Sequence, residues 1–186
     1  DGVIAIIITI MVLELKVPHG TDWAALEPVA PVFFTYVLSF VYIGIYWNNH
    51  HHMLQVTEHV NGKILWANLH LLFWLSLVPF VTGWMGENRF EAVPTAVYGV
   101  VLLCSGLAYN LLARVIVQAE GEGSAIAKAV GNDTKGKISA VLYAVSIPLA
   151  FVHQWVSDIL YVAVALMWLI PDRRIESQVA KHDPKH

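Results

Sequence analysis

The sequence predicts an all-α integral membrane protein with six transmembrane helices per subunit, and its composition carries most of that prediction. Hydrophobic residues make up 57% of the 186 residues and charged residues only 13%, against roughly 25% charged in soluble domains. The mean hydropathy is +0.59. A formal net charge of −3 gives no reason to expect a nucleic-acid partner. The single cysteine, Cys104, excludes a disulfide framework and a cysteine-based metal site.

The first segment, 1–17, is the most informative stretch of the chain. Between Asp1 and Glu14, its only polar side-chain group is the hydroxyl of Thr9. The segment is rich in β-branched residues, but in lipid only a helix or a closed barrel satisfies every backbone N–H and C=O. Thr9 has two open interpretations: a hydroxyl that bonds a carbonyl one turn earlier, or a polar group placed for function. Because the chain opens at Asp1 without an initiator methionine, we expect native sequence to precede it.

Five further apolar segments lie near 29–52, 64–85, 93–117, 137–153 and 155–171. Each approaches the roughly 20 residues that a spanning helix needs. Pro79 interrupts the third of the six segments. Little room to turn remains at 153–158, so the last two segments form either two full spans or a short hairpin that only just spans. The prediction is a six-helix transmembrane domain over 1–171, followed by a tail over 172–186.

The positions of the basic residues test this topology independently. With six spans, both termini share one side of the membrane with the loops after the second and fourth helices. That side holds nine basic residues, Lys63, Arg114, Lys128, Lys135, Lys137, Arg173, Arg174, Lys181 and Lys185, and the other side holds only Lys16 and Arg89. The positive-inside rule therefore predicts a protein of the inner membrane with both termini, and the tail, in the cytoplasm.

Polar side chains at one membrane boundary are candidates for a buried network. The second predicted helix ends in Trp47-Asn-Asn-His50-His51-His52, and the third opens with Trp66-Ala-Asn68. Trp47 and His50 are three residues apart and share a helix face. Asp1, His50 and Asn68 fall at one membrane depth, so we predict a structural network of these three with Trp47. The alternative is an aromatic belt with solvated histidines, which applies most to His51 and His52.

These residues resemble markers of a known family. Asp1-Gly2, with the isoleucine-rich run up to Thr9, resembles the end of the Phe-Ser-Asp signature on the first helix of the bacterial transmembrane protein 175 family, relatives of the endolysosomal potassium channel. Ser39-Phe40…Trp47-x-x-His50 and Asn68…Pro79-Phe80 resemble the markers on its second and third helices, in the right order. The signature's Arg, Phe and Ser would precede Asp1 and are absent from this chain.

The resemblance implies a potassium-selective cation channel rather than an enzyme, with no separate pore loop, no cofactor and no bound metal. K⁺ and other monovalent cations would pass, and lipid would surround it. A single six-helix repeat implies a homotetramer with four first helices around a central pore. In the family, bulky apolar side chains of that helix form the constriction. Carried over from the signature Asp, these positions are Ile6, Ile10 and Leu13, and Thr9 matches a threonine that shapes selectivity.

The spacing of these residues is coherent with that assignment. Positions 6, 10 and 13 follow the i, i+4, i+7 pattern of one helix stripe, and Thr9 borders it. A ring of isoleucines offers an ion no ligands, so the ion must shed water, and K⁺ holds its water less tightly than Na⁺. Hydrophobic constrictions also dewet and close. Glu14 lies one turn beyond Leu13, as either a cation-concentrating group at the outer mouth or a solvated interfacial carboxylate.

Two other classes of function stay open from the residues alone. A membrane haem or metal protein would use the cluster His50, His51 and His52, with His59 and His70, because imidazole suits haem iron and transition metals. Consecutive histidines point in three directions, which limits how many meet one metal. A proton-coupled secondary transporter would use Asp1 and His50 as its relay.

Overall fold

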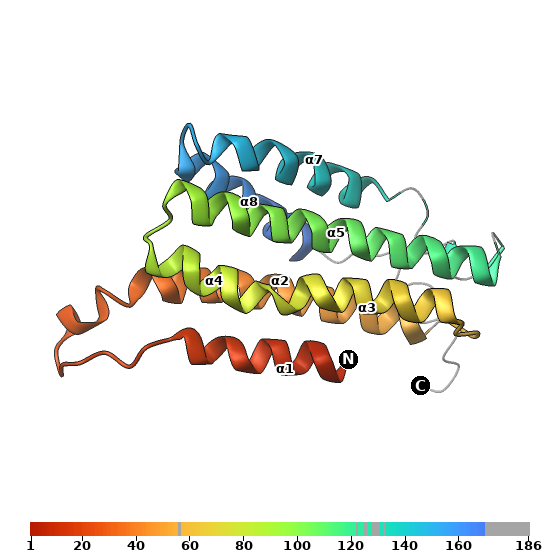
Figure 1. The fold of residues 1–186 in the computed structure, drawn as a ribbon, viewed down its shortest axis with the longest axis horizontal. Helices are drawn as coiled ribbons and strands as arrows, with labels where there is room; N and C mark the ends of the chain where they lie inside the picture. Colours follow the sequence, from red (N-terminus) through yellow and green to blue (C-terminus); the bar gives the residue numbers. More distant parts are fainter. Residues whose placement is uncertain (56, 122, 125, 128–130, 132, 170–186) are drawn as a thin grey trace.

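The computed structural model describes residues 1–169 except 56, 122, 125, 128–130 and 132, and over these residues the protein is a bundle of helices (Figure 1). The all-helical prediction is confirmed. In chain order the elements are α1 (Gly2–Ile10), η1 (Met11–Glu14), η2 (Trp23–Leu26), α2 (Ala30–Gln55), α3 (Gly62–Ser76), α4 (Val78–Glu87), α5 (Ala92–Glu120), α7 (Thr134–Leu149) and α8 (Gln154–Leu169). Lys128 and the predicted tail, 172–186, lie outside the described residues.

Each of the six predicted segments is helical, but their lengths differ. Three described stretches are long and apolar enough to cross a membrane: Ala30–Gln55, Gly62–Glu87 and Ala92–Glu120. Gly2–Glu14 and Gln154–Leu169 are apolar but shorter. The 16 residues of α7 extend about 24 Å, less than the roughly 30 Å of a typical hydrocarbon core. As described, α7 and α8 are each shorter than a typical span, which is compatible with the short hairpin.

The third segment is broken where the sequence places Pro79. α3 ends at Ser76 and α4 begins at Val78, with Pro79 in its first turn. Proline has no N–H to donate to a carbonyl one turn earlier, and its ring crowds that carbonyl, so a continuous helix is interrupted here. A side-chain cap starts α3, because the Asn61 carboxamide oxygen accepts from the N–H of Ile64 at 3.1 Å.

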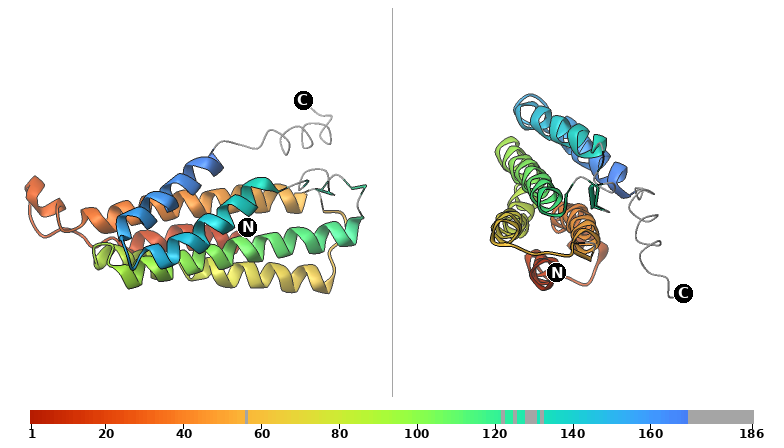
Figure 2. Two further views of the ribbon diagram at one scale, coloured as in Figure 1. Left: turned by 90° about the horizontal axis from the view of Figure 1, so that it is seen from above. Right: turned by 90° about the vertical axis from the view of Figure 1, so that its right-hand side faces the viewer.

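The helices lie roughly along the long axis of the molecule, with α1 at one edge and α7 with α8 at the opposite side (Figures 1 and 2). α1 contacts α2, α3 and α4, whereas α5 contacts α3, α4, α7 and α8. The C-terminal ends of α2 and α5 and the N-terminal end of α3 lie at one end of the bundle, and α7 begins on the same side, beside Asn110 of α5 and short of the α5 C-terminus (Figure 1). Within the described part of the chain, no helix covers the outer side of α1.

Buried hydroxyl groups join the helices in the middle of the bundle. The Ser39 hydroxyl on α2 lies 2.9 Å from that of Tyr98 on α5 and 2.6 Å from that of Thr82 on α4. The Tyr42 hydroxyl donates to the backbone carbonyl of Tyr161 on α8 at 2.5 Å. Interhelical hydrogen bonds of this kind help to hold helices together where lipid removes the usual hydrophobic drive. They fix α2, α4, α5 and α8 as the scaffold on which α1 rests.

Candidate functional site

α1 has one buried face and one exposed face. Ile4, Ile7 and Met11 are 0%, 3% and 0% exposed, and they pack in the core of the bundle. Ile6, Ile10 and Leu13 are 60%, 42% and 78% exposed. The predicted stripe therefore lies on the side of α1 that the other described residues leave exposed. An apolar side chain that is exposed in one subunit must face lipid, another copy or an aqueous pore.

Thr9 lies on the exposed side of α1, next to the stripe. Its hydroxyl donates to the backbone carbonyl oxygen of Ile6 at 2.9 Å. This is the internal hydrogen bond to a carbonyl one turn earlier, the first of the two interpretations of Thr9. That bond uses the only hydrogen of the hydroxyl, so the lone pairs of the oxygen remain available outside the helix. An internally bonded threonine can therefore still offer an oxygen ligand to a cation.

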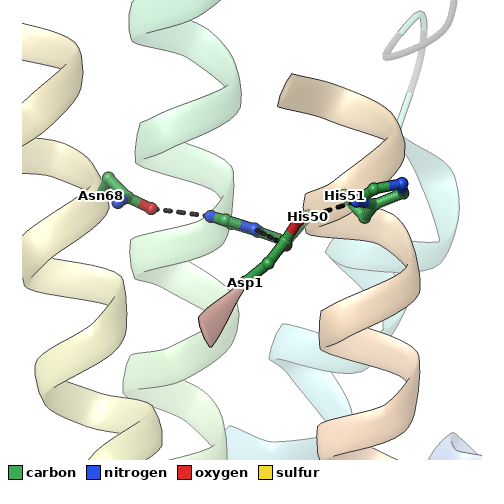
Figure 3. A network of polar contacts seen from close by, with 4 residues as sticks. All are labelled: Asp1, His50, His51 and Asn68. Atoms are coloured by element: carbon green, nitrogen blue, oxygen red, sulfur yellow. Dashed lines mark hydrogen bonds and ion pairs between the residues drawn. The ribbon is translucent and has the colours of Figure 1, made fainter. Parts of the chain in front are cut away.

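The predicted polar residues at the start of α1 and the end of α2 meet in the structure. His50 Nδ1 lies 3.2 Å from Asp1 Oδ1, and His50 Nε2 lies 2.7 Å from Asn68 Oδ1 (Figure 3). An ionised Asp1 only accepts hydrogen bonds, so Nδ1 donates to it. His50 is 1% exposed, and both of its ring nitrogens are occupied. The imidazole thus links the first residue of the chain to α2 and α3.

Trp47 is placed differently from the expectation that paired it with His50. It is 40% exposed, and its ring stacks on His51, with ring centroids 5.6 Å apart and planes at 16°. His51 in turn donates from Nδ1 to Asp1 Oδ2 at 2.7 Å. The spacing i, i+4 between Trp47 and His51 also places two side chains on one helix face. The i, i+4 spacing is visible in the sequence, although the aromatic-belt alternative places His51 among the solvated histidines.

The geometry bears on the metal alternative. His50 and His51 direct ring nitrogens at Asp1 and Asn68 rather than at a common point. Among the described residues, Glu58, His59 and Glu120 form a group whose ligand atoms lie within 4.8 Å of one another. The backbone N–H groups of Glu58 and His59 donate to Glu120 Oε1 at 2.9 and 2.8 Å. Three ligand atoms are one short of a closed structural zinc site.

Glu14 turns toward α4. Its carboxylate packs against Gly83, where a Cβ would come within 2.5 Å of Glu14 Oε2. Nearby, Lys16 Nζ lies 2.5 Å from Glu87 Oε1 in an exposed ion pair. Glycine at position 83 therefore leaves the space that the Glu14 carboxylate occupies against α4.

Comparison with known proteins identifies the family. A relative from Chryseobacterium sp. (strain P1-3), named a potassium channel, is 52% identical over 182 residues, which cover 98% of this chain and 95% of the relative. The model of the family described as "Endosomal/lysosomal potassium channel TMEM175" matches residues 1–79. The chain belongs to the TMEM175 family.

Two further matches extend the similarity to the TMEM175 family. A protein from Streptomyces collinus (strain DSM 40733 / Tue 365), also named a potassium channel, is 37% identical over 120 residues, or 60% of this chain and 58% of that protein. The crystal structure of a lysosomal potassium-selective channel TMEM175 homolog from Chamaesiphon minutus matches with a TM-score of 0.75 and 26% identity, covering 91% of this chain and 92% of that chain. The part matched by the TMEM175 family model contains α1, α2 and α3, and with them the stripe and the polar contacts of Asp1.

Proposed function

We propose that four copies of this chain form a potassium-selective channel whose central pore is lined by the exposed face of α1. The assignment of the chain to a potassium channel family does not depend on the number of copies or on which helix lines the pore. The chain is a membrane protein of a potassium channel family and not an enzyme, because the relative from Chryseobacterium sp. that is named a potassium channel matches 98% of its length and the family model matches residues 1–79. K⁺ is then the permeant ion.

The observation that carries the finer proposal is the contrast between the two faces of α1. The buried face, with Ile4, Ile7 and Met11, holds the helix on the bundle. The opposite face presents Ile6, Ile10 and Leu13 on a helix that already lies at the edge of the subunit (Figure 2). A symmetric assembly around that edge brings equivalent side chains together in rings.

The mechanism we propose uses the cost of dehydration. A ring of Ile6 side chains offers no ligand to an ion, so the ion loses part of its water to pass, and K⁺ loses it more easily than Na⁺. The oxygen of Thr9, next to the ring, replaces part of the lost water. An apolar ring of this kind also closes the pore when it dewets. Ile10 and Leu13 extend the apolar lining toward the other end of α1.

The placement in the membrane follows from length and charge. We propose that all six helical segments cross or nearly cross the bilayer as one domain over 1–171, with the thinner parts accommodated by local thinning. Lys63, Lys135 and Lys137 lie in the first turns of α3 and α7, at the end of the bundle where α2 and α5 finish, and Lys16 and Arg89 lie near the other end. The end with more basic residues is proposed to face the cytoplasm, with both termini on that side of the inner membrane.

Reconstitution into a planar bilayer tests the function. With K⁺ on one side and Na⁺ on the other, the reversal potential should approach the K⁺ equilibrium potential and should not move when a pH gradient is imposed. A reversal potential that follows the proton gradient would instead indicate a proton-coupled transporter. A visible absorption band from the purified protein would indicate a haem protein.

Cysteine accessibility tests the lining directly. Cys104 is the only native cysteine, so single cysteines are introduced on a Cys104→Ser background. A charged methanethiosulfonate reagent should block current through Ile6→Cys and Ile10→Cys channels, because their thiols face water in the pore. The buried position in Ile4→Cys should remain unmodified. If the thiols of Ile6→Cys and Ile10→Cys do not react, the exposed face of α1 meets lipid and the pore lies elsewhere.

A further inference from the structure

A second candidate site lies on the other side of the bundle from α1. The structure holds a cavity of about 160 Å³ lined by residues of α2, α5, α7 and α8. Of these helices, α5, α7 and α8 lie across the bundle from α1 (Figure 2), whereas α2 contacts both α1 and α8. The cavity therefore lies within one subunit and is separate from the proposed pore.

The lining of the cavity changes from apolar to charged along the bundle axis. Tyr42 and Asn49, both lining residues on α2, are seven residues or about 10 Å apart along the helix. On α5 the lining extends from Leu103 in the interior to Arg114 at the mouth. On α7, whose chain direction is opposite, it extends from Tyr143 in the interior to Lys137 at the mouth. Three helices thus place their polar lining residues at the same end, where α2 and α5 finish and α7 begins. The cavity has an aromatic and aliphatic interior and a polar mouth.

The charged residues of the mouth carry a net positive charge, because Arg114 and Lys137 outnumber its one carboxylate, Asp133. Asp133 Oδ1 accepts from the backbone N–H of Gly136 at 2.8 Å, and Oδ2 accepts from Asn110 Nδ2 at 2.9 Å. Asp133 is therefore engaged in starting α7. Arg114 forms no ion pair with an acidic side chain among the described residues, and Lys137 also lines the cavity. An arginine near the membrane boundary suits a phosphate group, which its planar guanidinium can bind through two hydrogen bonds.

The interior has room because residue 106 of α5 has no side chain. A Cβ built at Gly106 would meet only the Tyr46 hydroxyl, at 3.6 Å. A dry cavity of about 150 Å³ is large enough for benzene. The interior therefore accepts a ring or a short stretch of hydrocarbon chain and not a whole lipid, while the rest of the ligand stays at the mouth and in the bilayer.

We propose that this cavity binds one anionic phospholipid from the adjacent leaflet, with its phosphate at Arg114 and Lys137 and part of one acyl chain between α2, α5 and α7. Basic pockets between transmembrane helices bind anionic headgroups in this way. The two parts of the lipid match the two parts of the lining. A bound lipid would tie α7 to α2 and α5, and so would stabilise the subunit.

Thermal unfolding of the delipidated protein in detergent tests the proposal. Phosphatidylglycerol should raise the unfolding temperature more than phosphatidylcholine with the same acyl chains. Arg114→Gln should weaken phosphatidylglycerol binding about fivefold, the factor that corresponds to about 1 kcal/mol for one basic residue near a headgroup. Gly106→Leu should remove the phosphatidylglycerol-specific increase, because its side chain fills the interior. Lys63→Gln, which removes a charge at the same end of the bundle but outside the cavity, should retain the increase.

Two further arms separate the sources of the effect. Glycerol phosphate, the headgroup without acyl chains, should not stabilise the wild type; equal stabilisation would overturn the acyl-chain part of the proposal. Phosphatidylglycerol with a photoreactive group on its acyl chain should label wild-type peptides from α2, α5 or α7, a result that does not depend on how any variant folds. Labelling confined to α1 and α3, or an equal loss in Lys63→Gln, would overturn the cavity as the site.

Discussion

Ile4 and Ile6 lie two residues apart on α1, yet Ile4 is fully buried and Ile6 is 60% exposed. At about 100° per residue, they point about 200° apart around the helix. Ile4 packs in the core formed with the other helices, so its identity serves the subunit. Ile6 is not part of that core, so its apolar side chain is available to contact whatever lies against the exposed face of α1. The pair therefore separates the effect of an apolar side chain on folding from its effect on conduction.

Replacing Ile6 with asparagine tests the constriction. An amide is similar in size to the isoleucine side chain, but it offers hydrogen bonds that replace lost water, so the barrier should fall for every cation. Ile6→Asn should increase total current and let Na⁺ pass nearly as well as K⁺. Ile6→Ala widens the ring without adding ligands and should cause a milder loss of selectivity. Bi-ionic reversal potentials in planar bilayers measure both effects.

Ile4→Asn is the matched control. It places an amide in the core of the bundle, and a buried polar group without a partner costs about 1–3 kcal/mol. The expected result is a lower yield of assembled protein by size-exclusion chromatography, with normal selectivity in the channels that form. Loss of selectivity in Ile4→Asn, together with wild-type behaviour of Ile6→Asn, would place the pore on the other face of α1.

Thr9→Ala tests whether the threonine oxygen acts on the ion. The hydroxyl hydrogen is bonded to the Ile6 carbonyl, so removing it costs the helix little, while the oxygen ligand disappears. K⁺ should still flow, with weaker discrimination against Na⁺. Thr9→Ser keeps the oxygen and should keep the selectivity. Unchanged selectivity in Thr9→Ala would mean that the hydroxyl serves only its internal bond.

The sequence predicts the parts of this structure that depend on local spacing. The i, i+4, i+7 pattern places Ile6, Ile10 and Leu13 on one face, and Pro79 breaks the third segment, because both effects arise within a single helix. The contacts of Asp1 with both His50 and His51 depend on where α1 begins relative to the end of α2. The hydrogen bond between the hydroxyls of Ser39 and Tyr98, 59 positions apart, depends on how α2 and α5 pack. Spacing along one helix carries no information about such contacts.

The two histidines of the Asp1 contacts should differ in their effect on stability. His50→Ala removes two hydrogen bonds from a buried position and leaves Asn68 without its partner, at a cost of about 1–3 kcal/mol. Assembly or thermal stability should fall while selectivity stays near normal. His51→Ala removes one partly exposed bond and a stacked ring, so it should cost less. A His50→Ala protein with wild-type stability and lost K⁺ preference would place His50 in the pore.

Two glycines on α4 offer the last test, because the same substitution meets different neighbours. A Cβ at Gly86 would lie 2.6 Å from the Val32 Cα and 2.5 Å from Thr35 Oγ1, so the backbones of α2 and α4 would have to separate. A Cβ at Gly83 would meet the end of the Glu14 side chain, which can rotate away. Alanine also favours a helix over glycine by about 1 kcal/mol. At position 83 that gain should prevail, and at position 86 the clash with backbone should prevail.

Thermal unfolding of both variants should therefore give opposite results. Gly86→Ala should unfold at a lower temperature than the wild type, and Gly83→Ala at an equal or higher temperature, with Glu14 displaced from α4. Recording K⁺ current from Gly83→Ala then shows whether the position of Glu14 affects conduction, since the fold is kept and only the carboxylate moves. If Gly86→Ala matched the wild type in stability, α2 and α4 would not approach as closely as the Val32 contact requires.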